Sequence, residues 1–221
     1  GIGDIREHAM GCISNLLSLS SNQAAFMLPE LELCSALRYV MTVDKGNLRS
    51  YACSAVHLLS SHPPNLAALV DESQIIEAIV SVCVDCKSGD KCIPYACSVV
   101  CKLATVAKYR PRLSSNELGL ISVLVELLES EVGKARLFSC ATLSFLSLEK
   151  SNQTFMASHE LGLVGLLTSL IDLDQCKLTE YCCSMARTLS MDAVNRTVMM
   201  DDETNLLTGM VIVMTSSDSS V

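Results

Sequence analysis

The chain has 221 residues, half of them hydrophobic and 18% charged, with a formal net charge of -8. A chain this apolar can bury a continuous core, which excludes intrinsic disorder. No apolar run reaches the roughly 18 residues of a membrane span, so we expect no membrane insertion. The negative charge disfavours nucleic acid and anionic lipid surfaces as partners and favours a basic or neutral polypeptide.

A four-residue phrase returns every 43 or 44 residues. It reads Tyr51-Ala52-Cys53-Ser54, Tyr95-Ala96-Cys97-Ser98, Phe138-Ser139-Cys140-Ala141 and Tyr181-Cys182-Cys183-Ser184, after a weaker first copy, His8-Ala9-Met10-Gly11. Self-similarity at a fixed long period is the signature of stacked repeats that bury their apolar faces against one another. We expect a single repeat domain over residues 1–221, part of a longer array or protein, with units beginning near residues 5, 48, 92, 135 and 178.

Each unit begins with a helix of about sixteen residues that carries the phrase, called here the phrase helix. In the second copy Ala52, Ala55, Val56 and Leu59 recur at steps of three and four residues and form one apolar face. A polar stretch over residues 60–64 then predicts the end of this helix.

An asparagine fourteen residues after the phrase opens is expected to begin a short second helix. Asn65 stands at the N-cap position ahead of Leu66, Leu69 and Val70. In the third copy Tyr109 takes this place. The other copies have the asparagine at Asn22, Asn152 and Asn195. The pattern predicts a structural N-cap rather than a binding residue.

A longer apolar helix is expected to close each unit. The third copy shows its wide stripe at Leu120, Val123, Leu124, Leu127 and Leu128, and the fourth at Leu163, Leu166, Leu167, Leu170 and Ile171. Breaks that contain Gly46, Gly89 and Gly133 are typical of helix C-termini and precede the next phrase helix.

A short helix followed by two longer ones, with the pattern Ala-x-x-Ala-Leu-x-x-Leu-Ser, resembles the armadillo repeat. The resemblance covers nearly the whole chain and is clearest over residues 138–171, in Cys140-Ala141-Thr142-Leu143-Ser144-Phe145-Leu146-Ser147, Asn152 and Glu160-Leu161-Gly162-Leu163-Val164-Gly165-Leu166-Leu167. It implies an all-α fold, a right-handed α-solenoid of about five armadillo-like three-helix repeats, with HEAT repeats as the near alternative. The repeat sequence is more similar to the arrays of plant-type U-box ubiquitin ligases and related scaffolds than to those of nuclear import adaptors.

The resemblance implies that the phrase helices line a concave groove. Import adaptors hold a basic peptide there with a Trp and, four residues later, an Asn from each unit. The Trp position holds Gly, Ser or Ala in every copy, and the chain has no Trp. Only the first copy keeps the Asn, at Asn15. A nuclear-signal receptor of the usual kind is therefore not expected.

Residues three and seven positions apart share a helix face, so each phrase helix should present a ring, a small residue and a variable residue in one stripe. The candidate groove residues are the ring row His8, Tyr51, Tyr95, Phe138 and Tyr181 and the variable row Asn15, Leu58, Lys102, Phe145 and Thr188. Tyr supplies a large rigid contact area with a polar tip, which favours partner binding. The alternative is that these rings only pack against the neighbouring unit.

A secondary basic spot gathers around Tyr109, formed by Lys108, Arg110 and Arg112. Charge-assisted hydrogen bonds from such a spot would suit an acidic motif or a phosphate. A solvated loop with no partner is the alternative.

Twelve cysteines are explained by the repeat rather than by disulfides or metal. Cys53, Cys97, Cys140 and Cys183 occupy one slot in successive units, and slots about 10 Å apart are too distant for a disulfide. Buried free thiols indicate a reducing compartment, the cytosol or the nucleus, and no secretion signal is recognisable at the start. The spacing of Cys83-Val84-Asp85-Cys86 and the cysteines after it matches no familiar zinc framework, so no metal is expected.

No catalytic constellation or cofactor motif is recognisable. The four histidines form no pair with a nucleophile at motif spacing, and no glycine-rich phosphate loop is present. We expect a protein-protein interaction module or scaffold that binds a protein or an extended peptide, without catalysis or cofactor. The alternatives are the substrate-recognition part of a ubiquitin ligase and a structural subunit of a large assembly. The apolar segment over residues 206–214 is expected to be covered by a further repeat or a partner.

Overall fold

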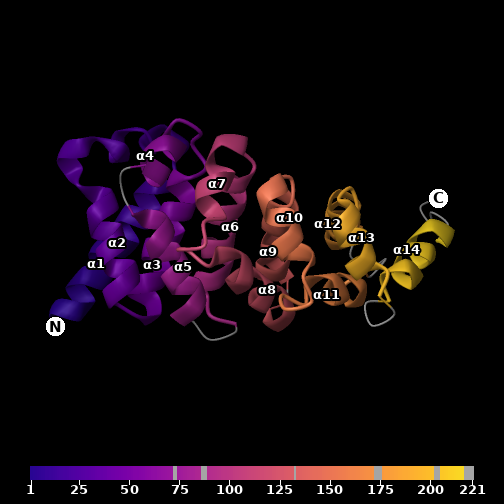
Figure 1. Ribbon diagram of the computed structural model, residues 1–221. Coiled ribbons are helices and arrows are strands. Elements are labelled where there is room, and N and C mark those ends of the chain that lie inside the picture. The colour runs from indigo at the N-terminus through magenta and orange to yellow at the C-terminus, as the bar shows by residue number, and fades with distance from the viewer. Residues whose placement is uncertain (72–73, 86–88, 132, 172–175, 202–204, 217–221) are drawn as a thin grey trace.

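The computed structural model describes residues 1–71, 74–85, 89–131, 133–171, 176–201 and 205–216. Figure 1 shows the helices stacked in an elongated array, with the N-terminus at one end and the C-terminus at the other. Within these ranges there is no β-strand. None of the described helices is long and apolar enough to cross a membrane.

The phrase helices form a continuous row along the array. They are α1 (Ile2–Leu17), α3 (Gly46–Leu59), α6 (Cys92–Ala104), α9 (Gly133–Leu146) and α12 (Cys176–Leu189). Each packs against the next phrase helix in the chain. Small residues in the shared interface permit this packing: the Cys97 sulfur lies 3.5 Å from the Ser139 hydroxyl, and the Cys140 and Cys182 sulfurs lie 3.7 Å apart. Both pairs are 42 residues apart in sequence, so equivalent regions of successive repeats lie in contact.

A second row packs beside the phrase helices. It consists of α2 (Leu33–Val43), α5 (Ile75–Asp85), α8 (Leu120–Ser130), α11 (Leu163–Ser169) and α14 (Leu206–Thr215). In this row α2 packs on α5, α5 on α8 and α11 on α14. Leu37, Ile79, Leu124 and Leu167 from this row are almost fully buried in the shared core. The predicted all-α solenoid of stacked helical units is confirmed.

Short helices complete the units. They are α4 (Asn65–Asp71), α7 (Arg110–Leu113, preceded by a 3-10 turn over Ala107–Tyr109), α10 (Lys150–Ala157) and α13 (Ala193–Met199). In the first unit, 3-10 turns over Ser20–Asn22, Ala25–Met27 and Pro29–Leu31 stand in place of the short helix.

The recurring asparagine does not do what the sequence predicts. The N-cap of α10 is Glu149, and that of α13 is Asp192, whose carboxylate accepts a 2.8 Å hydrogen bond from the Val194 amide. The asparagines instead donate their side-chain amides to the carbonyl six residues earlier. The pairs are Asn22 with Leu16 at 2.9 Å, Asn65 with Leu59 at 3.2 Å, Asn152 with Leu146 at 2.9 Å and Asn195 with Leu189 at 3.1 Å. They satisfy carbonyls that the phrase helix leaves open at its C-terminus.

The residue before each second-row helix has a left-handed backbone, with φ between 47° and 68°. These residues are Glu32, Gln74, Gly119, Gly162 and Asn205. The breaks before three phrase helices also use positive φ, at Gly46, Gly89 and Gly133, as their glycines predict. Glu32 and Gln74 adopt a conformation that side chains disfavour, which explains why sequence patterns did not reveal the rule.

One cysteine of the repeating slot departs from the prediction of a buried thiol. Cys53, Cys97 and Cys140 are buried, whereas Cys183 is half-buried. The other three lie under the following phrase helix, but no phrase helix follows α12 within the described residues. The neighbouring Cys182, turned toward α9, is the buried one.

Candidate functional site

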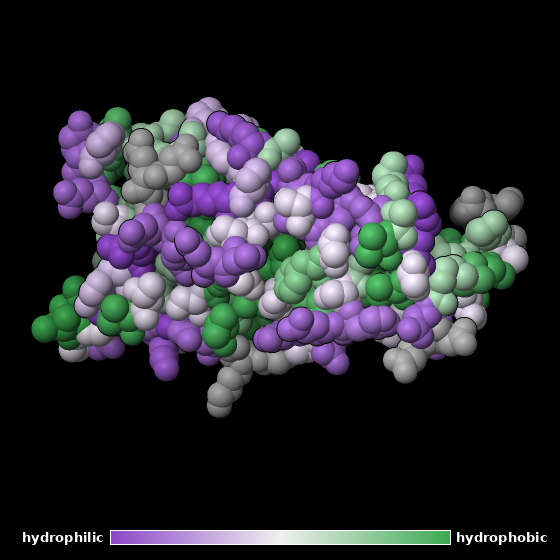
Figure 2. Space-filling model, in the orientation of Figure 1, coloured by the Kyte–Doolittle hydropathy of each residue, from purple (hydrophilic) through white to green (hydrophobic). Residues whose placement is uncertain are grey.

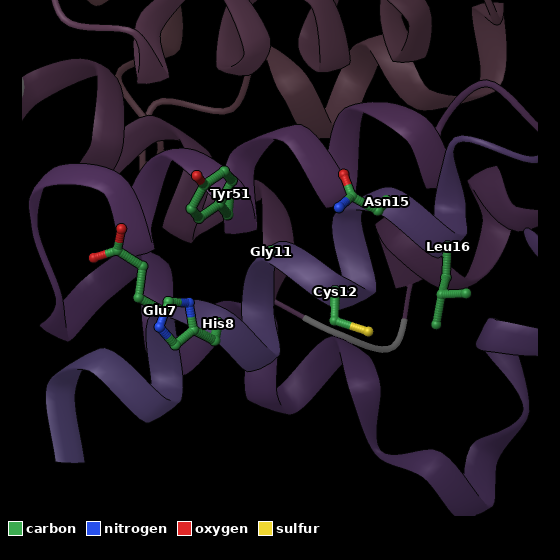
Figure 3. A pocket seen from close by; sticks show the side chains of 7 residues that line it. All are labelled: Glu7, His8, Gly11, Cys12, Asn15, Leu16 and Tyr51. Carbon is green, nitrogen blue, oxygen red and sulfur yellow. The ribbon is translucent and has the colours of Figure 1, made fainter. Parts of the chain in front are cut away.

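The first hollow of the array lies between α1 and α3. Tyr51 extends from α3 across α1, where a Cβ on Gly11 would stand in ordinary van der Waals contact with its ring at 3.8 Å. His8 and Asn15, both exposed on α1, line the same hollow of about 560 Å³. Figure 3 shows their side chains on α1, with that of Tyr51 beside them from α3. The structure thus brings together three of the predicted groove residues.

A second hollow continues this surface toward α6. Tyr51 and Tyr95 both line it, together with Ser14, Ser54 and Lys91, and its volume is about 220 Å³. The Ser14 and Ser54 hydroxyls are 3.2 Å apart and connect α1 to α3 beneath the rings. Because Tyr51 belongs to both hollows, they adjoin each other along α1, α3 and the start of α6.

The ring row both packs and lines the groove. The Tyr95 ring lies 5.6 Å from the His57 ring of α3, and the Tyr181 ring lies 6.4 Å from the Phe145 ring of α9. These two rings therefore contact the preceding phrase helix, as the packing interpretation requires, and Tyr51 does the same beside Gly11. Yet Tyr51 remains 39% exposed, and the later rings of the row are only half-buried. Packing and partner binding are therefore compatible roles for the ring row, because packing fixes the position of rings that stay partly accessible.

Lys102 is the most strongly bound side chain of the variable row. Its ammonium donates to the His57 carbonyl at 2.8 Å and to the Ser61 hydroxyl at 2.7 Å. Burial lowers the pKa of Lys102 to about 8. Burial, with the charges of Lys102 and Lys134, lowers the pKa of His57 to about 4. At neutral pH a charged ammonium therefore lies beside a neutral imidazole, whose Nδ1 is 3.3 Å from the Lys102 nitrogen.

The other members of the variable row differ in accessibility. Leu58 and Phe145 are half-buried, like Phe138 of the ring row. Thr188 does not belong on a partner-binding surface, because its side chain is 6% exposed and its hydroxyl donates to the Ser184 carbonyl at 2.9 Å. A threonine within a helix readily makes this bond to the preceding turn.

The secondary basic spot is largely occupied by contacts within the chain. Arg110 donates to the Ala104 carbonyl at 2.8 Å and lies 3.6 Å from the Glu149 carboxylate. Arg112 pairs with Glu77 at 2.9 Å. The Lys108 ammonium lies 4.6 Å from the centre of the Tyr109 ring. Two of its three cations thus already have carboxylate partners.

The described part of the chain holds no group of three or more His, Cys, Asp or Glu side chains suited to a metal ion. Cys86, from the cysteine-rich segment considered for zinc, lies outside the described residues. Hydrogen bonding to Cys182 and burial raise the pKa of the Cys140 thiol, which keeps it protonated and unreactive.

The predicted groove residues did not include a row of residues four positions before the rings, of which Asn47 and Lys91 line the second hollow. The row is Asp4, Asn47, Lys91, Lys134 and Lys177. Four residues is one helical turn, so the same periodicity that identified the rings was sufficient to find it. His57 was missed because its position, six residues after the ring, was not included in the predicted stripe.

No family model matches the chain, and no curated protein matches it. Solved structures do. A computationally designed armadillo repeat protein for modular peptide recognition superposes with a TM-score of 0.79 at 16% identity, over 96% of this chain and 86% of that one. The fold is that of armadillo repeat proteins.

Two further designed armadillo repeat proteins align over 96% of this chain. For one of them the alignment includes 87% of the designed chain, with a TM-score of 0.77 and 14% identity. The other, in complex with the peptide (KR)4, covers 86%, with a TM-score of 0.76 and 14% identity. At these identities the armadillo likeness is a statement about fold, and function has to be argued from the groove.

Proposed function

We propose that this armadillo-like array binds an extended polypeptide in the groove along α1, α3, α6, α9 and α12. The observation that carries the proposal is the continuity of the hollows, which share Tyr51 and are lined by half-accessible rings. Concave surfaces with aromatic walls and a few polar groups are typical binding sites. The groove would act by binding alone, without catalysis.

The packing of the rings favours this use. A side chain that is held before the partner arrives loses little conformational entropy on binding, so more of the contact energy becomes affinity. Tyr95 is held against His57, and Tyr181 against Phe145. A solved neighbour of the same fold, a designed armadillo repeat protein, is in complex with a peptide, which supports the proposal by analogy.

A random peptide display library selected on the protein tests the proposal. Selected peptides should lose binding to the double variant Ser54→Arg/Ser184→Arg, which places bulky side chains on α3 and α12 within the groove. A matched control, Ser130→Arg/Ser169→Arg, makes the same chemical change at exposed positions on α8 and α11. Selected peptides that bind both variants as tightly as the parent protein would refute the groove as the site.

Recruitment of substrates for a ubiquitin ligase is a more specific form of the proposal. The resemblance of the repeat sequence to U-box-associated arrays supports this role. In that case the bound peptide belongs to a protein that is ubiquitylated, and a groove-blocking variant should stabilise that protein in cells. Unchanged turnover of every protein that binds the groove would contradict this form.

A covered C-terminal face is a further part of the proposal and connects it to the structural-subunit alternative. Leu207, Ile212 and Met214 of α14 are 61%, 52% and 83% exposed. Figure 2 shows apolar surface at this end of the array. In the earlier units the second-row helix packs under the next phrase helix, as α2 does under α3. We propose that a further repeat or a partner covers α14 in the same way.

The cysteines support a reducing compartment, the cytosol or the nucleus. Eleven described cysteines are free thiols, and six of them are buried. Retention of so many thiols without disulfides is typical of proteins kept under reducing conditions. A reporter fusion that accumulates in an oxidising compartment would contradict this placement.

A further inference from the structure

Three successive phrase helices carry a lysine at the same place. Lys91 is the N-cap of α6, and Lys134 and Lys177 are the second residues of α9 and α12. All three are exposed. Each stands one helical turn before a ring of the ring row, so it lies on the same helix face as the groove.

A lysine in the first turn of a helix is electrostatically unfavourable. The N-terminus of a helix is the positive end of its dipole, and it favours carboxylates over ammonium groups. The first turns of α6, α9 and α12 contain no acidic residue, whereas α1 has Asp4 at the corresponding position. Helix termini and lysines therefore add to the same positive potential along the middle and far part of the groove.

The positive charge converges on the Tyr95 and His57 rings. Lys91 lines the hollow that Tyr51 and Tyr95 share. Lys102 is hydrogen-bonded to His57, and the charge of Lys134 reaches the same imidazole. Lys91 thus shares a hollow with the Tyr95 ring, while Lys102 and Lys134 act on the His57 ring packed beside it.

The nearby carboxylates are engaged with backbone amides rather than with the lysines of this cluster. Among the described residues, neither Lys91 nor Lys134 forms an ion pair. Glu131 is buried and accepts hydrogen bonds from the Gly89 amide, and Asp90 accepts one from the Cys92 amide. Lys177, farther along the row, does pair with a carboxylate, at 2.8 Å from Glu180.

We propose that the groove selects an acidic extended peptide, with its carboxylates placed over the cluster formed by Lys91, Lys102 and Lys134. The inference rests on the proposed groove function and names the chemistry of its partner. It reverses the expectation of a basic or neutral partner that the net charge of -8 suggests. The local potential of a concave surface, rather than the total charge, decides which peptide is attracted.

Fluorescence anisotropy with two labelled peptides, (Glu-Ser)4 and (Lys-Ser)4, tests the inference. We expect the acidic peptide to bind about tenfold more tightly at low salt, with affinity falling as salt is added. The charge-reversal variant Lys91→Glu/Lys134→Glu should weaken the acidic peptide about tenfold and strengthen the basic one. The variant Arg38→Glu/Lys150→Glu alters total charge equally at exposed positions outside the phrase helices and should change neither affinity by more than about twofold.

The neutral variant Lys91→Gln/Lys134→Gln removes the charge without introducing repulsion and should weaken the acidic peptide about threefold. Equal or tighter binding of (Lys-Ser)4, or insensitivity of (Glu-Ser)4 to the Lys91 and Lys134 variants, would overturn the acidic preference. If the display library yields neutral or basic peptides that lose binding to Ser54→Arg/Ser184→Arg, the groove proposal holds and the acidic preference is wrong. Binding of no peptide of any composition would refute both.

Discussion

The side-chain amide of Asn195 donates a hydrogen bond to the backbone carbonyl of Gln153, 42 residues earlier, at 3.2 Å. Asn65 makes the same bond to the Gln23 carbonyl at 3.1 Å. Each of these buried asparagines also holds the C-terminus of its own phrase helix, at Leu189 or Leu59. One amide thus ends a helix and connects two units of the array.

This double role predicts unequal effects of removing the asparagines. Asn65→Ala and Asn195→Ala each leave two buried carbonyls without this donor and should lower the free energy of unfolding by about 2 kcal/mol. Asn152→Ala loses the bond to Leu146 and should cost about half as much, near 1 kcal/mol. Urea denaturation followed by circular dichroism measures the differences. Equal losses for Asn152→Ala and Asn195→Ala would show that the bond between units contributes nothing.

Two glycines three residues apart should respond in opposite directions to substitution by alanine. A Cβ at Gly162 or Gly165 would meet no atom within 4 Å, so only the backbone conformation differs. Gly162 has φ +68°, and Gly162→Ala should destabilise the protein by about 1 kcal/mol. Gly165 lies within α11, and Gly165→Ala should stabilise by a similar amount, about 1 kcal/mol. Thermal denaturation of the two variants checks the signs, and destabilisation by both would contradict the assignment.

His57 should make the free energy of unfolding decrease at acidic pH. Its pKa is about 4 in the folded protein against 6.5 ordinarily, because of burial and the charges of Lys102 and Lys134. Between these two values the unfolded chain binds a proton that the folded chain does not, so the free energy of unfolding falls as pH drops from 6.5 to 4. His57→Gln should remove this part of the pH dependence. Parallel pH profiles of the parent and the variant would show that His57 titrates normally.

The apolar face of α14 should make the protein self-associate when nothing covers it. Exposed apolar patches of this kind promote association. The triple variant Leu207→Lys/Ile212→Glu/Met214→Lys should therefore remain monomeric at concentrations where the parent protein associates. Sedimentation velocity over a concentration series measures this. A parent protein that stays monomeric throughout the series would contradict the need for a cover.

The architecture was predictable because repetition amplifies weak signals. Any one phrase helix is an ordinary apolar helix, but the return of Tyr51-Ala52-Cys53-Ser54 at a fixed interval indicates that matching faces stack. The three- and seven-residue spacing also predicts that the ring, the small residue and the variable residue of each phrase helix share one face. These inferences need only local geometry and the assumption of equal units.

The failed prediction for the asparagines depends on a contact between units, whereas two other failures have local causes. The partner of Asn195 lies in the preceding unit, so the sequence around the asparagine favoured the commoner N-cap role. Thr188 was predicted to be accessible but is buried, and its hydroxyl donates to the Ser184 carbonyl within its own helix. The lysine row escaped notice because it lies outside the four-residue phrase, although it keeps nearly the same interval from Lys91 to Lys134 and Lys177.

The five tyrosines of the chain provide the most direct test of the central claim, that a peptide binds along the groove. Tyr51, Tyr95 and Tyr181 are partly accessible in the groove, Tyr109 is buried, and Tyr39 is 54% exposed on the second-row helix α2. NMR spectra of protein labelled with 13C at the tyrosine rings should be recorded during titration with a selected peptide. Signals of the groove tyrosines should shift, while those of Tyr39 and Tyr109 should not. Shifts at Tyr39 with unchanged groove signals would contradict it.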